Sequence, residues 1–247
     1  MINDRREIGH MDRYARSEQV NRQLALLAAN APVTRRVVHA GERIFHSVDS
    51  FDRLYVVSAG ICKSVTLTSD GREQVIAVHF KGDWLGLGGI ASGKYDAEAI
   101  AMDTGEVWGV SYGALLLASQ RTPELMTLLH EAMSRELGRH RNALLSICTL
   151  PADARVAEFL RWWANALDQL GLRSDQLRLP MSRAEIGNFL GMTLESVSRA
   201  LSRLERDNLI RFSSGSRRDI EIPAMAALGS FVAQSTTDRR PDGLAVH

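Results

Sequence analysis

The stretch from residue 181 to 212, MSRAEIGNFLGMTLESVSRALSRLERDNLIRF, constrains the fold more than any other part of the chain. Ser182 and Glu185 have the S-x-x-E spacing of a capping box, so a helix begins at residue 182. Gly191 ends that helix and permits a sharp turn, and Thr193 can cap the next helix. Two helices joined by a turn of this length form a helix-turn-helix.

Both helices of this pair are amphipathic. One face of the first is apolar and is expected to be buried: Ile186, Phe189 and Leu190. The second helix has apolar residues at spacings of 3, 4 and 3 that are expected to face inward: Leu194, Val197, Leu201 and Leu204. Its other faces are polar: Glu195, Ser198, Arg199, Ser202, Arg203 and Arg206. The first three lie near the N-terminal end, which enters the major groove of DNA in this motif.

The chemistry of Glu195, Ser198 and Arg199 suits base recognition. Arginine offers two donors to O6 and N7 of guanine, glutamate accepts from the cytosine amine, and serine bonds a base edge or a phosphate. The structural alternative is an i,i+4 salt bridge between Glu195 and Arg199 on a solvated face. We favour DNA recognition because the pair lies on the second helix of a helix-turn-helix, and both interpretations can hold together. The three residues are the predicted base-reading set.

A basic hairpin follows the second helix. The runs LIRF, SSGS and RRDIEI indicate two strands and a turn, as in the wing of a winged helix. Between residues 199 and 218 there are six arginines against two acids, in a chain whose net charge is only +1. This local excess is the electrostatic footprint of a phosphate-binding surface. The predicted contacts to the DNA backbone are Ser182, Thr193, Ser202, Arg203, Arg217 and Arg218.

The region from residue 33 to 111 consists of short apolar runs separated by turn signals. RLYVVSAGICKSVTL gives two strands around Ala59-Gly60, SDG at 69–71 predicts a hairpin, and KGD at 81–83 a turn after the strand QVIAVHF. Further strands are expected at 97–101 and 106–110. Many short strands with regular turns indicate a β-roll or jelly roll. Residues 1–22 are polar and expected to be loosely ordered, with a short helix only over 24–29.

A long helix is expected from Pro123 to about Leu150. Its apolar positions form a narrow seam with near-heptad spacing: Met126, Leu129, Met133, Leu137, His140, Leu144 and Ile147. Such a seam predicts a two-helix coiled coil and hence a homodimer; the alternative is a helix packed on its own domain. Two facing His140 side chains would weaken the dimer when protonated, unless His140 serves only in packing or lies at the edge of the seam.

A second helical region begins at Pro151. Its apolar face comprises Val156, Phe159, Leu160, Trp163 and Leu167. The adjacent Trp162 and Trp163 are interpreted as core and half-buried packing rather than as a stacking site for bases.

The order of these elements resembles the Crp/Fnr family of bacterial transcription regulators, over about residues 24–225. The resemblance is strongest in RLYVVSAGICKSVTLTSDGREQVIAVHFKGDWLGL and in the helix-turn-helix. The pattern E-x-x-S-R at residues 195–199 is similar to the Fnr-type branch, which reads TTGAT half-sites arranged as an inverted repeat. The resemblance implies a homodimer that binds double-stranded DNA through Glu195, Ser198 and Arg199 and contacts RNA polymerase. Activator and repressor roles both stay open.

The fold expected is therefore α+β, with an N-terminal β-roll similar to cyclic-nucleotide-binding domains, a long dimerisation helix and a C-terminal winged helix-turn-helix. The expected divisions are a polar N-terminal segment (1–23), a β-roll sensor domain (24–115), a dimerisation helix (116–150), a winged helix-turn-helix domain (151–228) and a flexible tail (229–247).

The signal sensed is unknown. Fnr proper holds an iron–sulfur cluster on four cysteines, and this chain has only Cys62 and Cys148, so such a cluster is not expected. Cyclic-AMP-binding relatives clamp the phosphate with an Arg-Ser pair. Lys94-Tyr95-Asp96 occupies that neighbourhood here, and an aspartate disfavours a phosphate. Cyclic AMP is therefore not expected, and Gly86, Gly88 and Gly89 are assigned to turns.

The same residues bear on other functional classes. A haem- or thiol-based redox or gas sensor, or a cyclic-nucleotide-responsive regulator, remains the alternative function. His39, His46 and His79 are available to haem, but no spacing distinguishes one of them, and Cys62 lies in an expected strand as an inert thiol. No nucleophile–base pair, metal cluster or phosphate loop indicates an enzyme. A charged N-terminus and the lack of a long apolar run predict a soluble cytoplasmic protein with no membrane partner.

Overall fold

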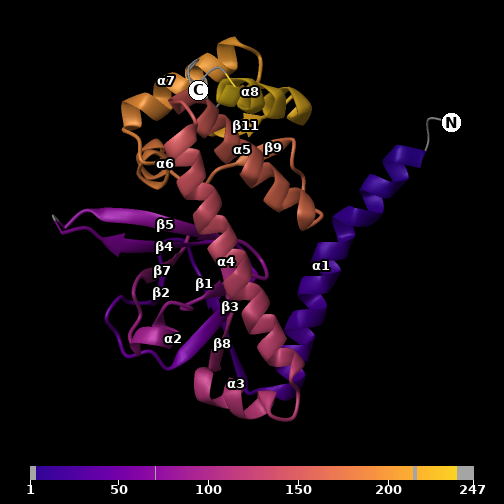
Figure 1. Ribbon diagram of the computed structural model, residues 1–247, viewed down its shortest axis with the longest axis vertical. Helices are drawn as coiled ribbons and strands as arrows, with labels where there is room; N and C mark the ends of the chain where they lie inside the picture. Colours follow the sequence, from indigo (N-terminus) through magenta and orange to yellow (C-terminus); the bar gives the residue numbers. More distant parts are fainter. Residues whose placement is uncertain (1–3, 70, 214–215, 238–247) are drawn as a thin grey trace, which may run out of the picture. The chain divides into compact units, whose positions relative to one another are not determined.

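The computed structural model describes residues 4–69, 71–213 and 216–237. The chain divides into two compact units, one made of Met1–Gly138 with Gln169–Gly171, the other of Arg139–Asp168 with Leu172–His247. Helix α4 (Glu124–Thr149) runs from one unit into the other. Figure 1 shows the order of the elements along the chain.

The first unit contains two four-stranded antiparallel sheets, so the predicted β-roll is confirmed. One sheet has the order β1-β8-β3-β6 and the other β2-β7-β4-β5. The strands are β1 (Val33–Val38), β2 (Arg43–Phe45), β3 (Arg53–Ala59), β4 (Cys62–Leu67), β5 (Glu73–His79), β6 (Trp84–Leu85), β7 (Glu98–Ala101) and β8 (Gly105–Ser111). The predicted pairing of the strands on either side of SDG is confirmed by the antiparallel β4–β5 ladder.

Side chains fill the space between the two sheets. Phe45 stacks on Tyr95 with ring centroids 4.0 Å apart and on Tyr55 at 5.6 Å. Val57, Val107 and Ala99 are fully buried in the same cluster. Because stacked aromatic rings occupy the middle of the roll, its interior is a packed core.

Helix α1 (Asp4–Asn30) corrects the expectation for the N-terminus. The loosely ordered segment and the short helix over 24–29 are wrong for the chain from Asp4 onward, since one helix continues through both. Val20, Leu24 and Leu27 are buried in a core cluster that also includes Val56 and Trp84. The local sequence is too polar to signal this helix, and burial of one apolar stripe on the β-roll stabilises it.

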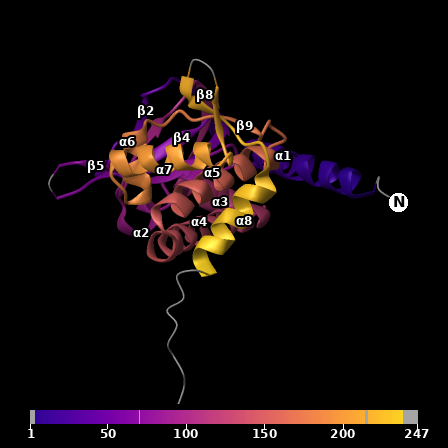
Figure 2. The same ribbon diagram turned by 90° about the horizontal axis from the view of Figure 1, so that it is seen from above.

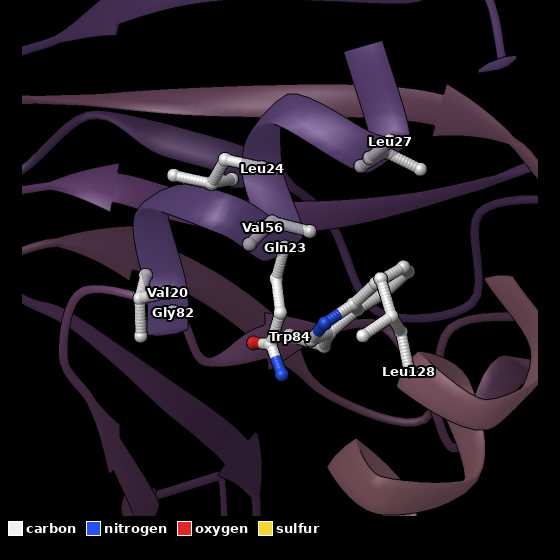
Figure 3. A pocket seen from close by; sticks show the side chains of 8 residues that line it. All are labelled: Val20, Gln23, Leu24, Leu27, Val56, Gly82, Trp84 and Leu128. Carbon is white, nitrogen blue, oxygen red and sulfur yellow. The ribbon is translucent and has the colours of Figure 1, made fainter. Parts of the chain in front are cut away.

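The C-terminal part of α1 packs on the β5–β6 turn and on the start of α4. Lys81 Nζ donates to Asn21 Oδ1 at 2.7 Å, and Thr122 Oγ1 donates to Asn30 Oδ1 at 2.9 Å. A mostly apolar pocket lies in the same region, and Figure 3 shows the Gln23 amide and the Trp84 indole among its lining side chains. Its lining residues are Val20, Gln23, Leu24, Leu27, Val56, Gly82, Trp84 and Leu128.

The predicted seam of α4 divides into two parts. Leu129 is only 2% exposed and Met126 packs on the core of the first unit, so these two residues are not available to a second chain. The exposed part begins at Met133 and includes Leu137 and Leu144, which are 69% and 61% exposed. Ile147 is also exposed.

The two short helices that precede α4 are α2 (Gly89–Ser92) and α3 (Tyr112–Ser119).

The second unit combines helices with a three-stranded antiparallel sheet of order β10-β11-β9. Its helices are α5 (Ala152–Gln169), α6 (Arg183–Leu190), α7 (Leu194–Arg206) and α8 (Met225–Thr237), and its strands β9 (Gln176–Arg178), β10 (Arg211–Ser213) and β11 (Ser216–Glu221). Trp163 is fully buried and Trp162 half-buried, with Trp162 stacked on Phe189 at 6.0 Å, so their interpretation as packing residues is confirmed.

Helix α8 corrects the predicted flexible tail. Residues 229–237 of that tail are helical, and Leu228 at the start of α8 is fully buried, which anchors the helix on its own unit. The rest of the predicted tail, 238–247, lies outside the described residues.

Candidate nucleic-acid interface

The helix-turn-helix is held by the caps that the sequence predicts. Ser182 Oγ accepts from Glu185 N at 3.2 Å, and Glu185 Oε2 accepts from Ser182 N at 2.7 Å. Gly191 follows α6 in the left-handed conformation with φ of +64°, and Thr193 Oγ1 accepts from Ser196 N at 3.2 Å. The capping box and both helix boundaries at the turn are therefore confirmed.

Gly187 is a determinant of this motif that the sequence interpretation missed. Met192 N donates to Gly187 O at 2.8 Å, and a Cβ on Gly187 would lie only 2.7 Å from Met192 O. The chain therefore passes so close to α6 that a side chain at this position would push the two helices apart. A glycine inside an otherwise helical pattern was the signal that could have identified it.

Helix α7 buries one face and exposes another. Val197, Leu201 and Leu204 are buried as predicted, but Leu194 is 46% exposed, so its inward assignment is wrong. Leu194 is the first residue of α7, and a helical side chain points back toward the N-terminus. Its side chain therefore extends past the buried face, which begins at Val197.

The predicted base-reading residues lie together on the outer face of α7. Glu195 and Arg199 are exposed and Ser198 is half-buried. Arg199 Nη2 donates to Ser196 Oγ at 3.4 Å. Hydrogen bonding to its own backbone N–H and to the Thr193 side chain lowers the pKa of Glu195, and the charge of Arg199 contributes further. Glu195 is therefore an ionised acceptor beside an arginine donor at the start of the helix.

The predicted backbone contacts fall into three groups. Ser202, Arg217 and Arg218 are exposed, and Ser182 and Thr193 serve as the caps described above. Arg203 is already engaged within the chain: its Nε and Nη2 donate to the two carboxylate oxygens of Asp153 on α5, each at 2.6 Å. The sequence pattern placed Arg203 with the DNA contacts, and only the folded chain reveals its acidic partner.

The structure adds Arg183 to the basic surface, a residue that the sequence interpretation did not select. Arg183 is the first residue of α6, and its guanidinium carbon lies 5.6 Å from the ring centroid of Phe212. Arg217 approaches the same ring at 5.8 Å. Burial lowers the pKa of Arg183, and the nearby charge of Arg217 lowers it further. Two cations thus converge on one aromatic ring where α6 begins, and helix N-termini are common phosphate contacts.

The wing forms as expected. Strands β10 and β11 are antiparallel neighbours, and β9 adds a third strand that the sequence did not signal. Residues 214 and 215 at the predicted turn lie outside the described residues. Acidic side chains offset part of the basic excess, since Arg211 Nη1 lies 3.9 Å from Glu221 Oε1 and Arg206 Nε lies 3.5 Å from Asp207 Oδ1.

The candidate sensing residues are dispersed. Cys62 is buried, and this burial, with the charge of Asp103, raises the pKa of its thiol to about 12. The predicted burial of Cys62 is therefore confirmed, and the raised pKa supports its assignment as an inert thiol. His79 is buried and its Nε2 lies 2.8 Å from Ser64 Oγ, whereas His39, His46 and His140 are exposed. Within the ranges 4–69, 71–213 and 216–237, no group of three or more His, Cys, Asp or Glu side chains could hold a metal ion.

The loop after β6 is tightly closed around Asp96. Gly88 lies so near the Asp96 carboxylate that a Cβ there would overlap it. Tyr95 is buried, and its hydroxyl donates to Arg53 O at 2.9 Å. The Lys94-Tyr95-Asp96 segment therefore brings a buried aromatic ring and a negative charge into this loop.

Within the described part of the chain, no helix is both long and apolar enough to span a membrane.

Comparison with known proteins identifies both units. Residues 154–231 match the family of Crp-like helix-turn-helix domains, and residues 35–121 match the cyclic nucleotide-binding domain. The chain is 33% identical over 191 residues to the transcriptional regulatory protein btr of Bordetella pertussis, covering 77% of this chain and 79% of that protein. It is 31% identical over 193 residues to the transcriptional activator protein FnrA of Stutzerimonas stutzeri, covering 78% and 79%. The solved structure of FixK2 from Bradyrhizobium japonicum superimposes with a TM-score of 0.70 at 30% identity, covering 81% of this chain and 96% of that one.

Proposed function

Since the chain belongs to the Crp/Fnr family of transcription regulators, we propose that it binds DNA as a homodimer and reads an inverted repeat of TTGAT-like half-sites with helix α7. The observation that carries this proposal is the outer face of α7, where Glu195, Ser198 and Arg199 lie together at the N-terminal end of the second helix of the helix-turn-helix. That end of the helix reads base edges in this motif.

Each of the three side chains has a specific role in this proposal. Arg199 donates to O6 and N7 of the half-site guanine, and Glu195 accepts from a cytosine amine, because these pairings match donors with acceptors. The proximity of the two side chains also orients Arg199. Ser198 lies beside Glu195 on the same face and contacts a base edge or its phosphate.

Contacts to the phosphates position the helix without reading sequence. Ser202, Arg217 and Arg218 are exposed and suit this role. Arg183 joins them because it begins α6 and shares the Phe212 ring with Arg217. Ser182 and Thr193 have a second role as caps, and Arg203 is left out because Asp153 already binds it.

Dimerisation is proposed through the exposed part of α4. Met133, Leu137, Leu144 and Ile147 lie at near-heptad spacing and are solvent-exposed in the single chain, which supports burial against a second copy. His140 lies in the same row. A two-fold dimer would place its recognition helices on the two halves of a palindrome. RNA polymerase is the further partner we propose, in the cytoplasm where the DNA lies; no catalytic activity is part of the proposal.

The sensory input is a separate question. Two cysteines do not supply the four thiolates of an Fnr-type cluster, and the packed roll interior and Asp96 argue against cyclic AMP. An ultraviolet–visible spectrum of anaerobically purified protein tests the remaining candidates, which are haem, a colourless ligand and no ligand. A Soret band would indicate haem, and iron–sulfur absorption would contradict the assignment. A featureless spectrum is expected for a regulator that uses a colourless ligand or is controlled by its own abundance.

The DNA assignment is tested by gel shift with a duplex containing TTGAT-N4-ATCAA. The purified protein is expected to bind it in preference to a scrambled duplex, with a strong dependence on salt. Arg199→Ala should cost about 1–3 kcal/mol of binding free energy and abolish discrimination against a duplex in which the half-site guanine is replaced. If wild-type protein shows no salt-sensitive preference for the TTGAT duplex, the proposed function is wrong.

A further inference from the structure

The charge pair between Asp153 and Arg203 connects α5 to α7, the proposed recognition helix. Asp153 lies in the first turn of α5, and Arg203 lies in the last turn of α7. Both guanidinium–carboxylate contacts are 2.6 Å, in the two-point geometry that holds an arginine in one orientation. The two residues are 50 positions apart, and Figure 2 shows α5 beside α7.

Arg203 lies at the border of the DNA-facing stripe of α7. That stripe contains Glu195, Ser198, Arg199 and Ser202, whose spacing repeats every three or four residues. At 3.6 residues per turn, Arg203 lies about 80° around the helix from Glu195, on the side toward buried Ala200. Its side chain is 40% exposed and that of Asp153 is 27% exposed. Arg203 is therefore close enough to the DNA face to reach a phosphate if Asp153 released it.

We propose that Asp153 is a specificity-determining residue that withholds Arg203 from the DNA phosphates while it fixes α7 on α5. This inference rests on the proposed DNA-binding function. A free arginine at this position would add one contact that every DNA sequence can accept, since phosphate contacts carry no sequence information. By neutralising that charge, Asp153 lowers the affinity for all DNA sequences alike. A larger share of the binding free energy then comes from the base contacts of Glu195, Ser198 and Arg199. The hydrogen bonding that Arg203 donates to Asp153, together with the charge of Asp153, also raises the pKa of Arg203, as expected for a paired cation.

Removing Asp153 and removing Arg203 should have different effects on DNA binding. Asp153→Asn keeps the size of the side chain and removes its charge, so Arg203 is freed. The slope of log affinity against log salt on a random-sequence duplex should then steepen by about 0.9 for each protomer, or about 1.8 for the proposed homodimer, and affinity for that duplex should rise by up to roughly 60-fold at 0.1 M salt. The preference for the TTGAT duplex over the random duplex should fall. Arg203→Ala alone should leave the slope at its wild-type value.

A double variant separates this effect from a loosened fold. In Asp153→Asn with Arg203→Ala, the freed charge is gone, so the slope should return to the wild-type value. The single variant Asp153→Glu should also have the wild-type slope, because it retains the negative charge. Glu158→Gln is the matched control, since Glu158 is also on α5 but pairs with Arg161 on the same helix at 2.8 Å; its slope should equal that of the wild type.

The outcomes are distinct from those that test the proposed function. A lower slope for Arg203→Ala, or an unchanged slope for Asp153→Asn, would show that Arg203 contacts phosphate in the wild type or cannot reach it, and either overturns the inference. An Asp153→Asn slope that persists in the double variant would overturn it as well. A wild-type protein without sequence preference would instead overturn the proposed function. The salt slopes of the variants on the random duplex would still test the role of Asp153.

Discussion

At the scale of single residues, environment decides which chemically capable side chains are available. Cys62 and Cys148 have the same chemistry, but Cys62 is buried in the β-roll and Cys148 is exposed on α4. Arg203 and Arg217 carry the same charge, but only Arg203 is held by a carboxylate at 2.6 Å. Residue type alone therefore overestimates the number of groups free to react or to bind DNA.

The two thiols should differ sharply in reactivity. At pH 8 a disulfide reagent is expected to modify Cys148 and leave Cys62 intact, because burial raises the pKa of Cys62 to about 12 and only the thiolate attacks. The measurement is the number of thiols modified in the folded protein, with Cys148→Ser as the control, which should show none until denaturant is added. Rapid modification of Cys62 in folded Cys148→Ser protein would contradict the buried assignment.

At the scale of elements, the β5–β6 turn is one of the places where α1 packs closely on the roll. Gly82 has a φ of +89°, and a Cβ there would lie 2.5 Å from Val20 Cγ2 on α1. The neighbouring Lys81 hydrogen-bonds Asn21 of the same helix. The turn thus depends on glycine for its backbone conformation and also for the close approach of α1.

Gly82→Ala should therefore destabilise the protein for two reasons. The positive φ costs about 1–2 kcal/mol for a residue with a Cβ, and crowding against Val20 adds about 1–3 kcal/mol. Gly93→Ala is the matched control, because Gly93 has a φ of +71° with open space around its Cβ position. Urea unfolding should show the larger loss for Gly82→Ala, and Val20→Ala should recover part of it. Equal losses for the two glycine variants would mean that α1 does not pack on this turn.

At the scale of the whole molecule, the exposed row on α4 is the feature that a single chain leaves incomplete. Leu137 and Leu144, which are 69% and 61% exposed, differ from isolated exposed apolar residues such as Leu172 because they lie in one near-heptad row on a long helix. The N-terminal part of the same seam is buried against the core of the first unit. The proposed dimer contact is consequently shorter than the seam that the sequence pattern indicates.

Leu137→Glu should dissociate the proposed dimer, because it places a charge in the middle of that contact. Sedimentation velocity should then show monomers at micromolar concentration, and affinity for the inverted repeat should fall by about 100-fold as the benefit of two linked recognition helices is lost. Leu172→Glu is the control, since Leu172 is 56% exposed but lies outside α4. A Leu137→Glu protein that remains dimeric would exclude this surface.

The sequence by itself determined the elements whose signals are local. Caps, turns and periodicity depend on residues a few positions apart, so Ser182 with Glu185, Gly191, Thr193 and the alternating strands of the roll could be identified before the fold was known. The outer face of α7 followed from the same periodicity, since burying Val197, Leu201 and Leu204 turns Glu195 and Arg199 outward.

Only the tertiary structure decided the features that depend on partners distant in the chain. Helix α1 is stabilised by burial on the roll, Leu129 is covered by its own unit, and Arg203 meets Asp153 across 50 positions. Arg183 joined the basic surface because the fold brings it to Phe212 and Arg217. Periodicity states which way a side chain points but not what it meets there, and for a charged side chain that neighbour determines whether it binds DNA or another part of its own chain.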